Sequence, residues 1–434
     1  MFSWHETTLR GLCRLAFGLL VVVPTCAVLL TAIWCRSPLS VEYYRRALAE
    51  QLALDVRLER VTFPRPDVTR FKGLSLADPE TGRPLAGFES LEWRTGAQTS
   101  TVICPQAELL DSSRLDLLTE LVARRLRVFA GARTAVEIQA ERLTLRLADG
   151  TSPETLTNVR GQLQCGPSEA RPQGAPPEPR GTVEFHLAGQ EKGAPARVSF
   201  YRTRSQERAT TSMKIDTGPT PLPARLIELC CPGWETWGPE STFCGELWWQ
   251  QRVDGLAGEV RGTIAGIDLD HLVSARSEHR LSGPAEVRLE EARFQHGRLL
   301  DATGSIHAGP GLVGRSLLAA AASQLHFTGN NPAAAWGDLA EYDEMGLHFA
   351  IDERGLRIKG LCTRSPGTVF LGRVHGQLLG EPPSGPQPLL GVVRLLANLG
   401  DAVPADPAAQ ALLSVLPPPG AVPSQAAGNK NPRR

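Results

Sequence analysis

Short runs of alternating apolar and polar residues are the dominant pattern in this chain. Leu143, Leu145 and Leu147 alternate with Thr144 and Arg146. Because successive side chains of a β-strand point to opposite faces, this period gives a strand one apolar and one polar face. The same spacing recurs at 183–187, 287–289, 347–351 and 356–358. We therefore predict a mainly β protein with a few helices, built from half-buried antiparallel strands.

The part of the chain that follows residue 40 predicts a helix and then a β-meander. Residues 40–53 favour a short helix with Ser40 as its N-cap. A strand pattern starts at Val56 and resumes at Val61 after a one-residue slip, which is typical of a β-bulge. The next strand is marked by Leu74 and Leu76, the turn by DPETGRP (78–84), and the return strand by Phe88, Leu91 and Trp93.

Further helices and breaks divide the rest of the chain. Residues 113–127 place Leu115, Leu118, Val122 and Leu126 on one helical face. Shorter helices are predicted at 389–399 and 408–415. Segments rich in proline and glycine mark the boundaries. The predicted regions are 1–36 with the membrane anchor, 37–165, a linker at 166–181, a second β-rich region at 182–380, and a Pro/Ala-rich tail at 381–434.

One long apolar segment lies near the N-terminus. Residues 16–34 carry no charge, and their number is close to the roughly 20 residues that cross a bilayer as a helix. A cleaved signal peptide is the alternative, with Arg10 and Arg14 as its positive region. The apolar run is longer than the usual 7–15 residues, and no small-residue cleavage site follows it. We expect an uncleaved single-pass anchor with the N-terminus inside.

Composition narrows the class of protein. Lys plus Arg and Asp plus Glu are both 46, so the formal net charge is zero, and 42% of residues are hydrophobic. This balance argues against a nucleic-acid binder and against a disordered chain. The cysteines outside the anchor region have no zinc-site spacing, and buried free thiols are the default interpretation. They are Cys104, Cys165, Cys230, Cys231, Cys244 and Cys362.

A search for catalytic chemistry gives no strong motif. The sequence contains no H-E-x-x-H, no G-x-S-x-G and no Walker A loop. His271 and His279 lie near Asp268 and Asp270 and are interpreted as surface residues. The stretch GPGLVG (309–314) matches G-x-G-x-x-G, but the strands before it are antiparallel in pattern, so it is interpreted as a turn that feeds a helix. We predict no catalytic, cofactor-binding or metal-binding residues and no nucleotide.

Two segments resemble a known family. Residues 52–93 combine a helix end, a strand, GLSLADPETG and a return strand, and residues 286–314 and 345–361 contain paired strands such as FAIDERGLRIKG. These resemble the opening and the C-terminal region of the AsmA-like superfamily of bacterial envelope proteins. Residues 162–280 show no such resemblance.

The resemblance implies a single transmembrane helix followed by an elongated, curved antiparallel β-sheet or β-groove with an apolar inner face. It also implies a non-enzymatic protein of the inner membrane, with its body in the periplasm, that takes part in phospholipid transport or outer-membrane assembly. Membrane lipid and another envelope protein are the expected partners, and no cofactor is expected. The lipid-facing candidates are Val56, Leu58, Leu143, Leu145, Leu147, Val287, Leu289, Leu347, Phe349 and Ile351.

Two other functions remain open at this stage. One is a structural or scaffold protein of the envelope that recruits a partner through its β domains or its tail. The other is an envelope hydrolase whose site is not visible as a motif, which requires a cleft that brings His271 or His348 together with carboxylates. An apolar groove lined by the candidate residues favours lipid handling over both.

Overall fold

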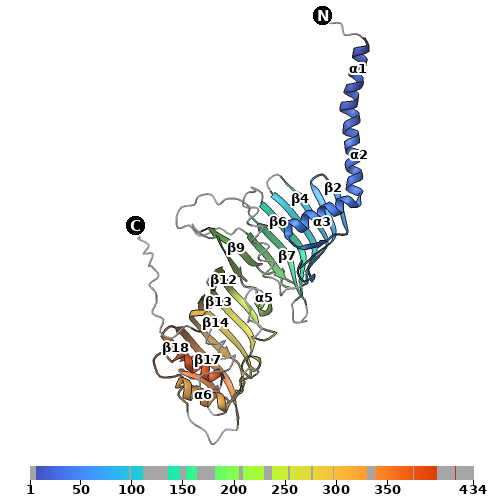
Figure 1. Cartoon of the computed structure of the whole chain (residues 1–434). Coiled ribbons are helices and arrows are strands. Elements are labelled where there is room, and N and C mark those ends of the chain that lie inside the picture. Colours follow the sequence, from blue (N-terminus) through green and yellow to red (C-terminus); the bar gives the residue numbers. More distant parts are fainter. Residues whose placement is uncertain are drawn as a thin grey trace. The chain divides into compact units, whose positions relative to one another are not determined.

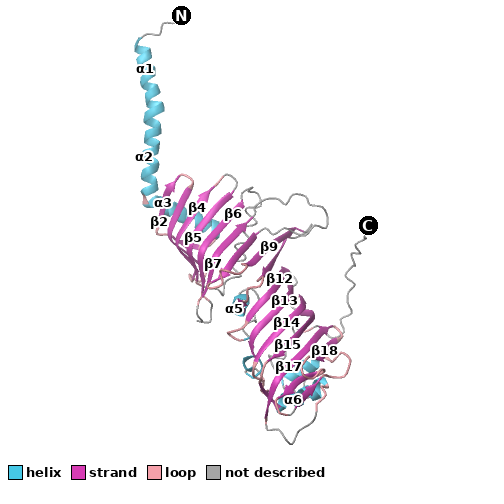
Figure 2. Cartoon of the chain, turned by 180° about the vertical axis from the view of Figure 1, so that it is seen from behind, coloured by secondary structure: helices cyan, strands magenta, loops and turns pink. Residues whose placement is uncertain are grey.

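The structure is a computed structural model that divides into two compact units. It describes residues 6–96, 99–110, 135–146, 153–163, 181–204, 209–228, 237–252, 255–274, 277–296, 298–329, 338–374, 376–397 and 416. The first unit comprises Met1–Gln173 and Val183–Glu191, and the second comprises Gly174–Thr182 and Lys192–Arg434. Within each unit the strands lie side by side in a curved sheet (Figure 2). The predicted helices at 113–127 and 408–415 lie outside the described residues, as does the predicted linker except for Gly181.

The first unit contains the N-terminal helices and the first eight strands (Figure 1). Its elements are α1 (Glu6–Phe17), η1 (Gly18–Val22), α2 (Val23–Arg36), α3 (Pro38–Leu52), β1 (Asp55–Arg57), β2 (Arg60–Arg65), β3 (Val68–Ala77), β4 (Pro84–Thr95), β5 (Thr99–Leu109), β6 (Ala135–Leu145), β7 (Glu154–Leu163) and β8 (Gly181–Leu187). Strands β3, β4 and β5 pair antiparallel in sequence order, whereas β5 and β6 are parallel. The prediction of a mainly β, curved fold is therefore confirmed, and the strand pairings given by the described residues are antiparallel apart from β5 and β6.

The N-terminal apolar helix is continuous through a short π-helical stretch. Residues Arg14–Arg36 are long and apolar enough to cross a membrane, and none of this segment is buried within the protein. Pro24 lacks a backbone N–H and lies directly after the π-helical stretch Gly18–Val22, whose wider turn accommodates the proline within the continuous helix. The structure thus supports a single N-terminal helix that can span a bilayer.

Two details of the first unit differ from the sequence predictions. Helix α3 starts at Pro38 with Ser37 as its N-cap, and Ser40 is buried in its first turn rather than capping it. Proline is favoured at the first helical position, which explains the earlier start. The predicted bulged strand is instead two strands, because β2 pairs with one half of β3 and β1 with the other half, on either side of Gly73 at φ 60°.

The second unit is an antiparallel sheet with helices on one side of its C-terminal part (Figure 1). Its elements are β9 (Ala196–Arg204), β10 (Ala209–Asp216), β11 (Leu222–Pro223), α5 (Ala224–Glu228), β12 (Thr242–Arg252), β13 (Gly255–Asp268), η5 (Asp270–Ser274), β14 (Pro284–Gln295), β15 (Arg298–Ala308), β16 (Gly311–Gly314), α6 (Arg315–Leu325), β17 (Leu339–Asp352), β18 (Gly355–Gly360), β19 (Thr368–Gly372), β20 (Gly376–Gly380) and α7 (Leu389–Ala397). In the GPGLVG segment, Gly311–Gly314 form β16 and lead into α6, so the predicted helix is present but most of the predicted turn is a strand paired with β17.

Strand register in the second unit sorts side chains onto two faces. Val287 of β14 lies opposite Ile306 of β15, which lies opposite Leu347 of β17. Their neighbours Arg288, Ser305 and His348 form the adjacent row. Because neighbouring rows point to opposite faces, one face of this sheet is apolar and the other is polar.

Ion pairs order the polar face. Arg261 contacts Glu259 at 2.6 Å and Glu291 at 3.3 Å, and Arg293 bonds to Asp301. These side chains are substantially exposed, so each pair contributes little stability. Their arrangement identifies the polar face as the water-facing side.

Candidate functional site

The apolar face of the second unit lines a partly open cavity of about 450 Å³. Every described residue that lines it is aliphatic, aromatic or methionine. Ligand pockets in proteins usually measure about 300–1,000 Å³, so the space is large enough for a small ligand or part of a larger one. An apolar cavity of only about 150 Å³ already binds benzene.

The floor of the cavity is formed by β14, β15 and β17. Val287, Leu289, Leu347, Phe349 and Ile351 all line it. The structure therefore brings together the five lipid-facing candidates of the second unit. Val287 is buried, whereas the other four are half-buried, so part of each of these four side chains is not covered by protein.

A glycine makes room for the aromatic ring in this floor. Gly304 lies between Leu289 and Phe349 in the strand register. A Cβ at Gly304 would meet Cζ of Phe349 at 3.0 Å, which is closer than normal packing allows. The absence of a side chain thus lets the Phe349 ring lie across β15 and deepens the apolar floor.

Two helices and the π-helical turn cover the opposite side of the cavity. Leu317, Ala321 and Leu325 come from successive turns of α6, and Val392 and Leu395 come from α7. The two helices approach closely, because a Cβ at Gly391 would meet the Gln324 carbonyl oxygen at 2.6 Å. Trp237 and two residues of η5, Leu272 and Val273, complete the cover. The sequence predicts both helices, and it predicts that the helix after GPGLVG covers the sheet, but it does not predict the position of α7.

His279 holds the two cover helices together. It is 1% exposed, which contradicts its interpretation as a surface residue. Its Nε2 lies 2.9 Å from the Leu395 carbonyl oxygen of α7 and its Nδ1 lies 3.1 Å from the Ser316 Oγ of α6. A carbonyl oxygen can only accept, so Nε2 donates to Leu395, and Nδ1 shares a hydrogen bond with the Ser316 hydroxyl. The buried imidazole is therefore part of the packing that fixes α7.

Tyr342 supports the same end of the sheet from within the core. It is fully buried, its hydroxyl donates to the Ser282 carbonyl oxygen at 2.7 Å, and its ring meets Phe370 edge to face at 5.4 Å between centroids. Burial raises the pKa of Tyr342 to about 12, so the hydroxyl stays protonated and keeps donating at physiological pH.

The lipid-facing candidates of the first unit do not form a comparable cavity among the described residues. Val56 has no exposed surface and Leu145 is buried, so both are core residues. Leu58 lies between β1 and β2 and is half-buried. Leu143 is half-buried and pairs with Ala107 and Leu156 in an apolar row. Leu147 lies outside the described residues.

The described residues also show where catalytic candidates lie. His348 Nε2 is 4.0 Å from a Glu290 carboxylate oxygen on the polar face, where His348 is half-buried and Glu290 is exposed. His271 is exposed. Within the described ranges no three His, Cys, Asp or Glu side chains gather where they could hold a metal ion.

Two of the described thiols, Cys104 and Cys362, are buried as expected, whereas Cys244 is only half-buried. Cys104 and Cys362 are free and buried, and burial raises the pKa of each to about 11. Since the thiolate is the reactive form, neither is suited to nucleophilic chemistry at neutral pH. Cys165, Cys230 and Cys231 lie outside the described residues.

The fold and the cavity define a mainly β protein with one N-terminal helix that can span a membrane and an apolar cavity in its second unit. Comparison with protein-family models, curated proteins and solved structures gives no match. Function must therefore be argued from the geometry of this chain.

Proposed function

We propose that this protein is a membrane-anchored, non-enzymatic lipid-handling protein of the cell envelope. The observation that carries the proposal is the 450 Å³ cavity with its entirely apolar described wall. Burial of apolar surface yields about 25 cal/mol per Å², so an acyl chain gains free energy in such a space, whereas a polar substrate loses its hydration without compensation.

The N-terminal helix supports the same proposal. A helix that can cross a bilayer keeps the body close to a source of lipid. We place this helix in the inner membrane with the body in the periplasm, as the resemblance to AsmA-like proteins implies. Phospholipid transport or outer-membrane assembly is the corresponding role, and acyl chains are the ligand.

Site-specific photocrosslinking in the full-length protein tests the proposal. The photoreactive amino acid p-benzoylphenylalanine is placed at Phe349, inside the cavity, or at His348, its neighbour on the polar face. After irradiation in intact membranes, mass spectrometry identifies what each position has captured. We expect phospholipid adducts at position 349 and none at position 348.

A cavity-filling variant provides the second arm. Ala321→Trp adds a large side chain to the cover helix where Ala321 lines the cavity. It should reduce capture at position 349 severalfold while thermal unfolding shows that the protein remains folded. Equal capture at 348 and 349, or no lipid at either, would overturn the proposal and favour the scaffold function.

A further inference from the structure

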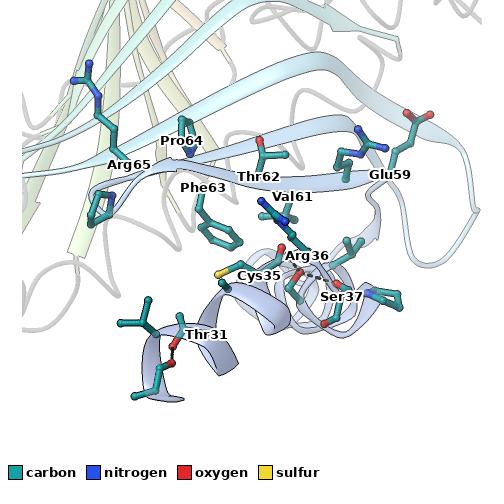
Figure 3. Close-up of a pocket in the computed structure, with 18 residues that line it drawn as sticks. Thr31, Cys35, Arg36, Ser37, Glu59, Val61, Thr62, Phe63, Pro64 and Arg65 are labelled. Atoms are coloured by element: carbon teal, nitrogen blue, oxygen red, sulfur yellow. Dashed lines mark hydrogen bonds between the residues drawn. The ribbon is translucent and has the colours of Figure 1, made fainter. Parts of the chain in front are cut away.

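The first unit contains a second space, a groove beside the end of the apolar helix. Its volume is about 1180 Å³, and it lies between the last turns of α2, the first turn of α3 and strand β2 (Figure 3). Ala27, Val28, Thr31 and Ala32 line it from α2. These residues belong to the segment that can span a membrane, so this side of the groove faces hydrocarbon.

Aromatic contacts join α2 and α3 to the strands on the other side of the groove. The Trp34 ring stacks on Phe63 of β2 at 6.4 Å between centroids, and Tyr44 of α3 contacts Phe63 at 5.7 Å and Phe71 of β3 at 5.8 Å. Tryptophan and tyrosine are favoured where hydrocarbon meets water. The contacts therefore fix the β2–β3 hairpin beside α2 at the membrane surface.

Arginines lie at both ends of the groove, because Arg60 begins β2 and Arg65 ends it. Arg36, Arg60 and Arg65 line it together with one acid, Glu59. No described side chain forms an ion pair with any of the three arginines. Arg36 projects from the helix end toward β2, whereas Arg65 extends from the strand away from the helix (Figure 3). Arg36 is thus the cation best placed to meet a ligand in the groove, and the other two lie at its rim.

The start of α3 adds a second feature that suits an anion. Pro38, Ser40 and Val41 of this turn line the groove, and Ser37 makes no side-chain capping bond to it. The N-terminus of a helix carries partial positive charge and favours a phosphate or carboxylate nearby. The N-terminus of α3 and Arg36 together form one positively charged region of the groove, which we call the cationic corner. It lies next to the apolar residues that α2 contributes to the groove.

We propose that this groove binds one anionic phospholipid of the surrounding bilayer, with the phosphate near Arg36 and an acyl chain along Ala27, Val28 and Thr31. The distance along the helix supports this placement. Residues 28 and 36 are roughly 12 Å apart along the helix axis, so a lipid whose phosphate lies near residue 36 can extend its acyl chain into the hydrocarbon beside residue 28. The inference depends on membrane insertion of α2 but not on the cavity of the second unit.

The test compares lipid composition at two faces of the same helix. In full-length protein reconstituted in bilayers of phosphatidylcholine and phosphatidylglycerol, p-benzoylphenylalanine is placed at Phe63, in the groove, or at Ile33. Ile33 is 65% exposed, and the 100° step of a helix places it on the face opposite the groove. We expect phosphatidylglycerol to be enriched severalfold at position 63 relative to its share of the bilayer, and captured in its bulk proportion at position 33.

Charge variants test the role of the cationic corner. Arg36→Gln should lower the enrichment at position 63 about fivefold, the effect of one arginine at an anionic membrane surface. Arg65→Gln should lower it less, because its side chain extends away from the helix. Arg57→Gln is the matched control, since Arg57 is an exposed arginine of β1 that does not line the groove.

Three outcomes would overturn the proposal: bulk lipid proportions at position 63, capture of protein instead of lipid, or an equal effect of Arg36→Gln and Arg57→Gln. The failure of this inference is distinguishable from that of the proposed function. Capture at Phe349 reports on the cavity alone, and enrichment at Phe63 reports on the groove alone.

Discussion

The two units use a similar strand pattern but surround their empty spaces differently. The cavity of the second unit has an apolar floor and an apolar cover in which α6 buries Leu317, Leu318, Ala321 and Leu325. The groove of the first unit lies beside α2, which buries no residue, and is lined partly by charged side chains. An alternating strand supplies an apolar face, but the elements around that face decide whether the space beside it is lined by apolar side chains alone or by apolar and charged side chains together.

The largest expected change in stability follows from substitution of Tyr342 in the core of the second unit. Tyr342→Ala removes a fully buried ring and should destabilise the second unit by about 3–5 kcal/mol. Tyr342→Phe keeps the ring but leaves the Ser282 carbonyl oxygen without its donor, at a cost of about 1–3 kcal/mol. Hydrogen exchange followed by mass spectrometry measures each unit separately.

The matched change in the first unit is Phe63→Ala. Phe63 is only half-buried, so its loss should destabilise by less than the loss of Tyr342. If Phe63→Ala proved the more damaging of the two, the contrast between a fully buried core residue and a half-buried groove residue would be incorrect.

The next effect concerns the cover of the cavity. His279→Ala leaves the Leu395 carbonyl oxygen and the Ser316 hydroxyl without their partner, which should lower the free energy of opening α7 by about 1–3 kcal/mol. Amide exchange in residues 389–397 should accelerate accordingly. His271→Ala is the control, because His271 is exposed and should leave α7 unchanged. Unaltered exchange in the His279 variant would mean that apolar packing alone holds the helix.

The smallest effect concerns α3 and pH. Hydrogen bonds from Arg45 and Arg46 lower the pKa of Glu42 to about 2 from its ordinary 4.5. Because the pKa is depressed in the folded state, the stabilisation is present above pH 4.5 and is lost as the pH falls toward 2.

Glu42→Gln should therefore lower the thermal unfolding midpoint slightly at pH 6, and the difference from the unmodified protein should disappear toward pH 2. Glu50→Gln, an exposed change on the same helix, should show no such pH dependence. A difference that persists at pH 2 would exclude the ion pairs as its source.

Much of the cavity floor could be predicted from the sequence. A period of two fixes which face a side chain takes, so the sequence alone predicts that Leu347, Phe349 and Ile351 share one apolar face. The anchor was predictable because membrane crossing requires only length and apolar composition.

The parts that could not be predicted depend on contacts between residues distant in sequence. His279 is buried by a bond to Leu395, which is 116 positions away, whereas the acidic residues near it in sequence suggested a surface position. The division of the first strand depends on Gly73, whose left-handed backbone marks where β3 changes its partner from β2 to β1. The groove arises from the approach of β2 to α2, which neither segment encodes alone.

The bend between α2 and α3 has a mechanical consequence. The Ser37 hydroxyl donates to the Trp34 carbonyl oxygen at 2.8 Å, the Ser40 hydroxyl donates to the Ser37 carbonyl oxygen at 2.9 Å, and Trp34 stacks on Phe63. These contacts make the joint stiff rather than hinged. A helix tilts to match bilayer thickness. If the joint is stiff, a change in the tilt of α2 also rotates the sheet of the first unit. The orientation of that sheet relative to the membrane would therefore depend on the thickness of the bilayer around the helix.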